Sequence, residues 1–303
     1  MILLTGAAGK TGKAILNSLV PHGVRVRSLV RSEKQAQEIR NLGSKEVAIA
    51  DLRDAQAIAN AMEGINKIYY ISPNMAPDEL EIGKLLINLG KERGVNRFVY
   101  HSVLHPQVED MPHHWQKMRM EEYLFKSDLD FTILQPCAYM QNVLANWRAI
   151  TNEGVYAVPY ATSARISVVD LFDVAAAAEV VLTQLNHSNA IYELAGPEAL
   201  SQDEVAAILT RELGKPVQAQ TQDRGLWAEN AQRSGMNEYS VNTLLKMFEY
   251  YENYGLIGNP NILNMLLKRP AATFSDFIHR YNNSEQRSWA NGNHATKDET
   301  HGQ

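Results

Sequence analysis

The 303-residue chain contains only one cysteine, Cys137. One cysteine excludes an intramolecular disulfide and a cysteine-rich zinc site, and it suits a reducing compartment. No apolar run reaches the roughly 18 residues that a membrane span requires. The N-terminus also lacks the basic segment and cleavage site of a signal peptide. We therefore expect a cytoplasmic protein that does not enter a membrane.

A surplus of basic charge is also absent. The chain has 34 Asp and Glu against 29 Lys and Arg, which gives a formal net charge of −5. Proteins that bind nucleic acid through its phosphates need excess positive charge, so nucleic acid is not the expected partner. The 45% hydrophobic and 21% charged residues are typical of a globular protein whose core needs no metal or disulfide. We expect the partner to be a small molecule.

In the first half of the sequence, short apolar runs alternate with segments of helical periodicity. Such alternation predicts a doubly wound parallel sheet covered by helices on both faces, the α/β architecture of a Rossmann domain. The predicted strands are 2–5, 24–30, 46–50, 67–72, 97–102 and 130–135, and the predicted helices are 11–19, 32–42, 55–62, 78–94 and 113–126.

This regularity fades after residue 150. We expect residues 1–150 to form the dinucleotide-binding domain, residues 151–282 a smaller C-terminal α/β substrate lobe, and residues 283–303 a disordered polar tail. Within the lobe we expect a strand-and-loop segment at 156–168, a helix at 170–185 capped by Asp170 and Asp173, a strand at 190–194, and a helix at 202–213 between Ser201 and Gly214.

A glycine-rich turn joins the first predicted strand to the first predicted helix. Glycine lets a backbone approach a pyrophosphate closely, and a helix N-terminus offers free N–H groups and a positive dipole end. An ordinary tight turn is the alternative, but the strand–turn–helix context favours dinucleotide binding. The predicted phosphate-binding residues are Gly6, Ala7, Ala8, Gly9, Lys10, Thr11 and Gly12.

The end of the second predicted strand indicates which dinucleotide binds. NAD-binding domains place an acidic residue there for the adenosine ribose, but this strand ends in Leu-Val-Arg31. Arg31 is suited to a 2′-phosphate, and Lys10 and Lys34 would add positive charge. We therefore favour NADP(H) over NAD(H), the alternative being that Arg31 is simply solvated.

Later strand ends supply further candidate cofactor ligands. Asp51 and Leu52 follow the third predicted strand, where such residues flank an adenine. Ser72 and Pro73 follow the fourth, near the expected nicotinamide half of the site.

The spacing GxxGxxG resembles that of extended and atypical short-chain dehydrogenases/reductases. The resemblance implies that Ser102, after the fifth strand, hydrogen-bonds a substrate carbonyl. It also implies a Tyr and a Lys four residues apart on the next helix. Here His113 and Lys117 occupy those positions. We expect Lys117 to bind the nicotinamide ribose, and we keep His113 as a candidate proton donor, with a surface role as its alternative.

Several segments together resemble the NmrA-like family of atypical short-chain dehydrogenases. They are TGAAGKTG at 5–12, Arg31, SPN at 72–74, HSVLH at 101–105, Lys117 followed by EEY at 121–123, and LQPCAYMQN at 134–142. The resemblance covers residues 1–280 and implies a Rossmann domain with a small substrate domain. The family generally lacks the Tyr of the Tyr-Lys pair. It includes NADPH-dependent quinone and azo-dye reductases, and also proteins that bind NADP(H) without turnover.

By the same resemblance, the segment after the sixth strand lines the nicotinamide and substrate cleft. Pro136 would shape the turn beside the cofactor, and Tyr139 or Asn142 would contact substrate. Cys137 is either a reactive thiol or an inert buried one, and the absence of basic neighbours in sequence favours the second.

Two other clusters have a functional and a structural interpretation. His101, His105, His113 and His114 are close in sequence, but without carboxylates at ligand spacing we expect no metal. An aromatic group near the C-terminus would line a quinone pocket or, more commonly, form core or homodimer contacts: Trp227, Phe248, Tyr250, Tyr251 and Tyr254.

The sequence thus predicts an NADPH-dependent reductase of quinone-like acceptors. The alternative is a non-catalytic NADP(H)-binding redox sensor, because both functions use the same nucleotide-binding residues. A third possibility, a relative of sugar-nucleotide epimerases, ranks low because the Tyr-Lys pair is missing.

Overall fold

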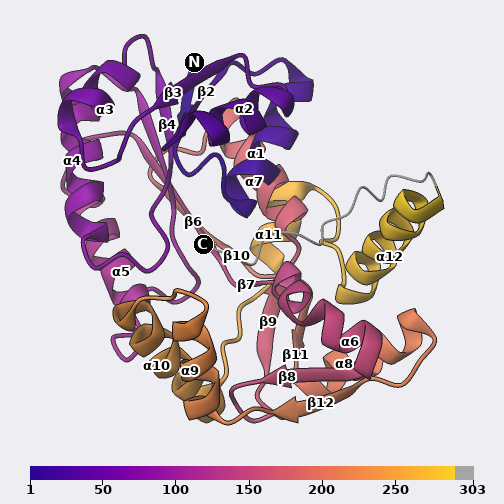
Figure 1. The fold of residues 1–303 in the computed structure, drawn as a ribbon. Coiled ribbons are helices and arrows are strands. Elements are labelled where there is room, and N and C mark those ends of the chain that lie inside the picture. Colours follow the sequence, from indigo (N-terminus) through magenta and orange to yellow (C-terminus); the bar gives the residue numbers. More distant parts are fainter. Residues whose placement is uncertain (291–303) are drawn as a thin grey trace.

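The structure, a computed structural model, describes the backbone of residues 1–290 and the side chains of residues 1–283. Its central element is a seven-stranded parallel sheet in the order β10-β6-β5-β4-β1-β2-β3 (Figure 1). Strand order reverses on the two sides of β1, which makes this point the topological switch of the sheet. The strands are β1 (Ile2–Leu4), β2 (Val26–Val30), β3 (Glu46–Ile49), β4 (Lys67–Ile71), β5 (Arg97–His101), β6 (Phe131–Pro136) and β10 (Ala190–Leu194).

Helices cover both faces of this sheet, as the alternating pattern predicts. Two separate hydrophobic cores result, one on each face. One face carries α3 (Ala55–Ala61), α4 (Glu79–Glu92) and α5 (Pro112–Phe125); the other carries α1 (Lys10–Leu19), α2 (Glu33–Asn41), α7 (Leu171–Thr183) and α11 (Asn261–Leu267). The predicted doubly wound Rossmann fold is confirmed.

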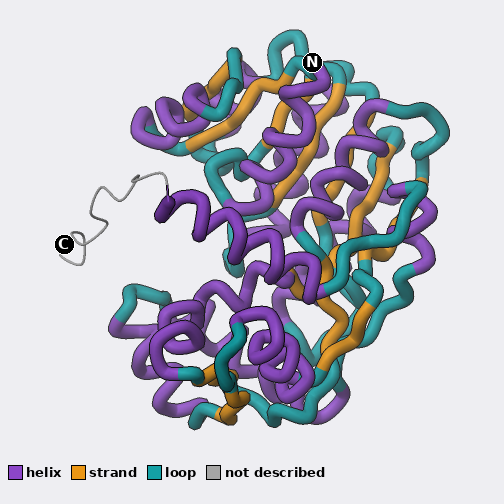
Figure 2. The backbone as a smooth tube through the Cα atoms, turned by 90° about the vertical axis from the view of Figure 1, so that its right-hand side faces the viewer, coloured by secondary structure: helices purple, strands orange, loops and turns teal. Residues whose placement is uncertain are grey.

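The remaining elements form a smaller α/β lobe with its own hydrophobic core, seen in the lower part of Figure 2. A three-stranded sheet has the order β11-β9-β7, and β12 pairs with β8. The lobe contains β7 (Ala138–Tyr139), the 3₁₀ helix Met140–Asn146, α6 (Trp147–Glu153), β8 (Val155–Val158), β9 (Ile166–Val169), β11 (Glu198–Leu200), α8 (Gln202–Leu213), β12 (Gln218–Thr221), α9 (Arg224–Arg233), α10 (Glu238–Tyr254) and α12 (Phe274–Ala290). As predicted, Ser201 caps the N-terminus of α8 and Gly214 its C-terminus.

The chain returns to the main sheet after residue 150. Strand β10 pairs in parallel with β6, with Ala190 opposite Thr132, and α7 packs against α1. The predicted domain boundary at residue 150 therefore places β10 and α7 in the C-terminal lobe, although both of them pack on the main sheet. The physical reason is that β6 would otherwise be an open edge, and an edge strand needs a partner or a cover.

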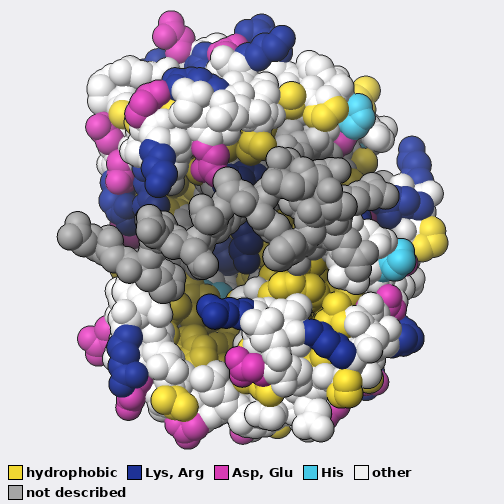
Figure 3. Space-filling model, turned by 45° about the vertical axis from the view of Figure 1, so that its right-hand side comes forward, with side chains coloured by type: hydrophobic (Ala, Val, Ile, Leu, Met, Phe, Trp, Pro, Cys, Tyr) yellow, Lys and Arg dark blue, Asp and Glu magenta, His cyan; other side chains and the backbone are white. Residues whose placement is uncertain are grey.

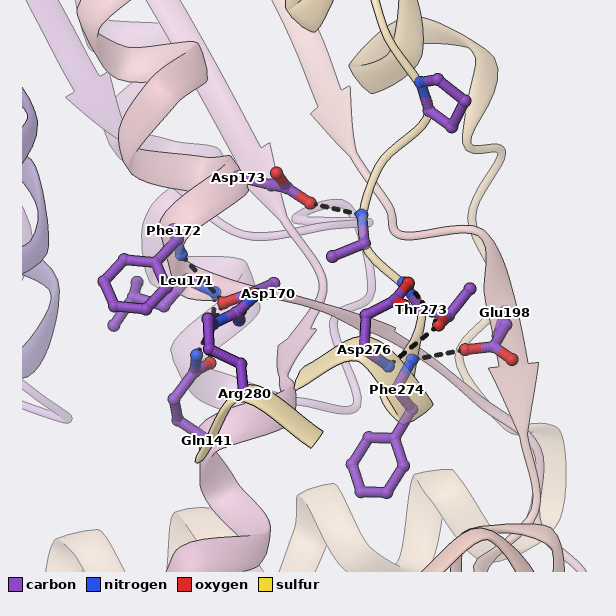
Figure 4. A network of polar contacts seen from close by, with 12 residues as sticks. Gln141, Asp170, Leu171, Phe172, Asp173, Glu198, Thr273, Phe274, Asp276 and Arg280 are labelled. Carbon is purple, nitrogen blue, oxygen red and sulfur yellow. Dashed lines mark hydrogen bonds and ion pairs between the residues drawn. The ribbon is translucent and has the colours of Figure 1, made fainter. Parts of the chain in front are cut away.

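Asp170 and Asp173, both expected to cap α7, have different partners (Figure 4). Asp170 is the N-cap: one carboxylate oxygen accepts from the Phe172 amide at 3.0 Å. Its other oxygen accepts from Arg280 of α12. Asp173 instead accepts from the Ala272 amide at 2.7 Å and from Arg269 at 2.6 Å. The two carboxylates thereby attach the C-terminal part of the chain to α7.

Helix α12 extends into the segment expected to be a disordered tail. Residues 283–290 are helical, and residues 291–303 lie outside the described part of the chain. The helix begins with a reciprocal cap, in which Asp276 accepts from the Thr273 amide at 2.9 Å and Thr273 accepts from the Asp276 amide at 3.1 Å. Its first turns bury Phe274, Phe277 and Ile278, and this packing anchors the helix despite its polar sequence.

Among the described residues, no helix is both long and apolar enough to cross a bilayer.

Candidate cofactor and acceptor site

A cleft of about 990 Å³ opens at the carboxyl ends of the parallel strands, next to the switch point at β1. On the face drawn in Figure 3, hydrophobic side chains gather in the hollow between the upper and lower parts of the molecule. Most of the predicted site residues line the cleft, namely Gly6, Ala8, Gly9, Lys10, Thr11, Gly12, Arg31, Asp51, Leu52, Ser72, Pro73, Ser102, His113, Lys117, Pro136, Tyr139 and Asn142. The exceptions are Ala7, which is fully buried, and Lys34, which is exposed but outside the lining.

The glycine loop is shaped by its own backbone. Gly6 has φ +60°, and a Cβ on Gly12 would lie 2.3 Å from the Gly6 carbonyl oxygen, so neither position suits another residue. Gly9 is the N-cap of α1 and supplies no side chain to cap it. The first turn of α1 therefore has no side-chain cap, and its residues Lys10, Thr11 and Gly12 line the cleft, an arrangement that fits a dinucleotide pyrophosphate.

Two cations stand free beside this loop. Lys10 and Arg31 are exposed and line the cleft, and their side chains make no hydrogen bond or ion pair within the described part of the chain. The Gln35 side chain accepts from the Arg31 amide at 2.9 Å and holds the end of β2 against α2. The arrangement can bind a 2′-phosphate without first breaking an existing pair.

Asp51, expected near the adenine, interacts with Arg53, a residue that was not predicted to belong to the site. Its carboxylate accepts from the Arg53 amide at 2.9 Å, and the Arg53 guanidinium forms an ion pair with Asp78 at 2.6 Å. The hydrogen bond from Arg53 lowers the pKa of Asp78. Arg53 also lines the cleft, where its position directly after Asp51-Leu52 was the available signal.

Lys117 is fixed by a buried acid. Its ammonium donates to Glu79 at 2.6 Å and to the Ser72 hydroxyl at 2.8 Å. The Glu79 side chain is only 2% exposed, and the same oxygen accepts from the Tyr100 hydroxyl at 3.1 Å. An acidic residue in the first turn of a helix is common, so the position of Glu79 in α4 does not predict this pair. The pair holds the ammonium at the wall of the cleft.

Ser102 has a different partner from the expected substrate carbonyl. Its hydroxyl donates to Glu121, a buried carboxylate that also accepts from the Gln135 amide group at 2.9 and 3.0 Å. Burial raises the pKa of Glu121. Because a serine has a single hydroxyl proton, Ser102 faces the cleft only as an acceptor in this arrangement.

His113 lies in the cleft as a neutral ring. Burial lowers its pKa to about 2, and its Nδ1 is buried without a partner among the described residues. The adjacent His114 ring packs edge-on at 4.5 Å between centroids. An imidazole with so low a pKa does not store a proton near neutral pH, which argues against the candidate role of His113 as an imidazolium acid.

Tyr139 projects into the cleft from β7 and belongs to a chain of three rings. Its hydroxyl lies 2.6 Å from Nε2 of His101, and Nδ1 of His101 lies 2.7 Å from the hydroxyl of the fully buried Tyr69. Burial lowers the pKa of His101 to about 3, so its ring is neutral. Neither His101 nor Tyr69 is among the site residues predicted from sequence.

The model of the NmrA-like family matches residues 1–285. The chain belongs to the NmrA-like family. The NAD(P)H azoreductase of Xenophilus azovorans is 29% identical over 282 residues, which cover 91% of this chain and 96% of that protein. Quinone oxidoreductase 2 of Escherichia coli strain K12 is 28% identical over 286 residues, or 93% and 99% of the two chains. The crystal structure of the E. coli NADPH-dependent quinone oxidoreductase QOR2 with NADPH superimposes with a TM-score of 0.82 at 27% identity, covering 93% of this chain and all of that one.

Burial keeps the single cysteine of this NmrA-like protein in its thiol form. Cys137 is buried, and burial raises the pKa of its thiol to about 12. A thiol rather than a thiolate therefore faces the cleft at neutral pH. Of the nearby histidines, His114 contacts the His105 carbonyl at 3.1 Å and His101 lies between two tyrosine hydroxyls. Within residues 1–283 no group of three or more His, Cys, Asp or Glu side chains is arranged to hold a metal ion.

The C-terminal aromatic residues of this NmrA-like protein do not line the cleft; two of the five are in the core, and Tyr254 is exposed. Phe248 and Tyr251 of α10 are buried, and the rings of Trp227 and Phe248 lie 4.7 Å apart. None of the five predicted aromatic residues is among those that line the cleft. The same helix instead presents Leu244 and Met247 to it, with Asn237 just before the helix.

Proposed function

We propose that this NmrA-like protein is an NADPH-dependent reductase that transfers a hydride to a flat, quinone-like acceptor. The observation that carries the proposal is that one cleft joins a phosphate-binding loop and two free cations to an apolar wall on α10. Its volume of about 990 Å³ is at the upper end for ligand pockets, about 300–1,000 Å³. The named activities of its similar relatives, azo and quinone reduction, agree with this chemistry.

The residues at one end of the cleft would hold the cofactor. The loop from Gly6 to Gly12 would bind the pyrophosphate, Lys10 and Arg31 the 2′-phosphate, and Lys117 the nicotinamide ribose. When bound, NADPH supplies the hydride from C4 of its nicotinamide. The Glu79 pair would keep Lys117 in place before the cofactor arrives, which reduces the entropy lost on binding.

The opposite end would select a flat, largely apolar acceptor. Leu244, Met247 and Cys137 supply apolar surface, and His113 presents a neutral ring. Removing water from such a wall favours flat aromatic molecules over small ions.

The direct test is NADPH oxidation with a panel of quinones and azo dyes. The proposal expects turnover above the uncatalysed rate for at least one of them. Tight binding of NADP⁺ with no turnover on any acceptor would contradict it and favour the redox sensor.

Cofactor choice is tested by titrating NADPH and NADH against the wild type, Arg31→Ala and Lys34→Ala. Arg31→Ala should weaken NADPH binding by about tenfold, equivalent to about 1.4 kcal/mol, and leave NADH binding unchanged. Lys34→Ala is the matched control, because this cation is exposed outside the cleft. Equal affinities of the wild type for both cofactors would remove Arg31 from the proposal.

The cytoplasmic location and the homodimer stay predictions. Light scattering on purified protein measures the second, and imaging of a tagged chain in the cell measures the first. A monomer in solution would leave the proposed chemistry intact, since every residue named for it comes from one chain.

A further inference from the structure

The proposed hydride transfer does not supply the second proton that a quinone needs on reduction. Reduction of a quinone needs two electrons and two protons, and NADPH delivers both electrons and one proton as the hydride. The second proton must come from an acid beside the acceptor or from water. The tyrosine that supplies it in the general short-chain pattern is replaced here by His113, whose ring is neutral.

The Tyr69–His101–Tyr139 chain determines where hydroxyl protons point. A neutral imidazole has one N–H and one bare nitrogen, and both nitrogens of His101 face a tyrosine hydroxyl. If Nδ1 carried the proton, the hydroxyl proton of Tyr69 would have no acceptor, because this hydroxyl is fully buried and His101 is its only hydrogen-bond partner in the described structure. A buried donor without an acceptor costs free energy, so Tyr69 donates to Nδ1 and the imidazole proton lies on Nε2.

This assignment fixes the direction of the Tyr139 hydroxyl. Its oxygen accepts from Nε2–H of His101, so the hydroxyl proton of Tyr139 does not point at that ring. Because Tyr139 lines the cleft, this proton is directed toward the cleft instead. Burial raises the pKa of Tyr139 to about 12, so the phenol keeps that proton at neutral pH until an anion forms next to it.

The geometry points to Tyr139 as the catalytic proton donor to the reduced acceptor, with His101 and Tyr69 as positioning residues that direct its hydroxyl into the cleft. This inference rests on the proposed reductase function. The hydride from NADPH reduces the quinone to a hydroquinone monoanion and leaves NADP⁺. The O–H bond of Tyr139 then breaks, its proton goes to the anionic oxygen, and the phenolate regains a proton from water. The hydrogen bond donated by His101 stabilises that phenolate.

The test compares two kinds of acceptor. A quinone needs the extra proton, whereas a cationic triphenylmethane dye becomes a neutral product on accepting hydride alone. Tyr139→Phe should lower kcat for the quinone by about 100-fold, the lower range for general acid catalysis, and leave NADPH affinity and dye reduction unchanged. Added imidazolium should restore part of the quinone rate in Tyr139→Phe and have no such effect on the wild type.

Two further variants distinguish the loss of a positioning hydrogen bond from a general effect of changing a buried tyrosine. Tyr69→Phe removes the donor to Nδ1 and should lower the quinone rate by about tenfold, without affecting the dye rate. Tyr156→Phe is the matched control: it is another buried tyrosine, but its hydroxyl contacts Gln202 at 2.9 Å, outside the cleft lining. This control should keep both rates.

Other results would overturn the inference. An equal loss of both rates in Tyr139→Phe, or no loss of either, would exclude proton donation. If the wild type does not reduce the dye, the test is the rescue of Tyr139→Phe by imidazolium. A lack of rescue would then exclude proton donation by Tyr139. A wild type that binds NADPH but reduces no acceptor would instead contradict the reductase function itself, and the inference with it.

Discussion

The two ends of the cleft treat charge in opposite ways. At the nucleotide end, Lys10 and Arg31 are exposed cations without partners among the described residues, and the helix beside them has no side-chain cap. At the acceptor end, the titratable groups are buried and held uncharged: burial raises the pKa of Cys137 and Tyr139 and lowers that of His113. One end is prepared to bind anions, and the other excludes them. Lys117, paired with Glu79, lies between the two.

The largest effect is expected at Lys117, where the two ends of the cleft meet. Lys117→Met removes the partner of a buried carboxylate, and leaving such a charge unpaired should lower the free energy of unfolding by about 3 kcal/mol. Urea denaturation measures the loss. The double variant Lys117→Met with Glu79→Gln should recover most of the stability, because no unpaired charge remains, yet it should bind NADPH as weakly as Lys117→Met. If the single variant is as stable as the wild type, the pair does not hold a buried charge.

The nucleotide end can be disrupted by a substitution that displaces the backbone of the glycine loop. Gly12→Ala places a methyl group 2.3 Å from the Gly6 carbonyl oxygen and forces the loop apart. NADPH binding should weaken by about 100-fold, or about 3 kcal/mol, as measured by fluorescence titration. Gly90→Ala is the control, since its added Cβ would meet its nearest neighbour at an ordinary 3.5 Å. Comparable losses in both variants would indicate general destabilisation rather than damage to the loop.

The acceptor end can be probed with pH. In the unfolded chain histidine titrates near pH 6.5, whereas burial holds the pKa of His101 and His113 at about 3 and about 2 in the fold. Between these values the unfolded state binds more protons, so stability falls as pH drops below 6.5. Each buried ring should lower the free energy of unfolding by about 2 kcal/mol as the pH falls from 6.5 to 5.

Urea denaturation at the two pH values checks this expectation. His113→Leu should remove about 2 kcal/mol of the pH dependence. His279→Leu, at an exposed histidine, should leave it unchanged. An unaltered pH dependence in His113→Leu would mean that this ring titrates normally in the fold.

The smallest effect should come from salt. Exposed cations are screened when ionic strength rises, because the Debye length falls from about 10 Å at 0.1 M to about 3 Å at 1 M. The Kd for NADPH should therefore rise several-fold over this range, while the KM for an uncharged quinone should stay constant. A parallel change in both would mean that the two ends are not electrically distinct.

The residues predicted for the nucleotide end lie together in the structure because their determinants are local. The glycine loop, Arg31 and the strand ends each occupy a few consecutive residues, and parallel strands bring their carboxyl ends together. Lys34 shows the limit of the same logic: it is close to Arg31 in sequence, but it lies in the first turn of α2 and is not among the residues that line the cleft.

The acceptor end was not predictable in this way. The decisive contacts here and at the boundary with the nucleotide end join residues from separate elements: Glu79 of α4 to Lys117 of α5, and Tyr69 of β4 to His101 of β5 and Tyr139 of β7. Each of these residues also has an ordinary structural interpretation when taken alone. Only the register of β4 and β5, in which Tyr69 lies opposite Val99 and His101 opposite Ile71, brings the tyrosine and the histidine within reach.

The late arrival of β10 has a consequence for synthesis of the chain. When residue 150 has left the ribosome, every strand that pairs directly around the nucleotide loop has been made, but β6 still has an unpaired edge and α1 lacks the cover of α7. Both are supplied only by residues 171–194. During that interval the nascent Rossmann sheet exposes apolar surface and an open edge, which makes it a substrate for chaperones and a poor candidate for expression as a separate fragment.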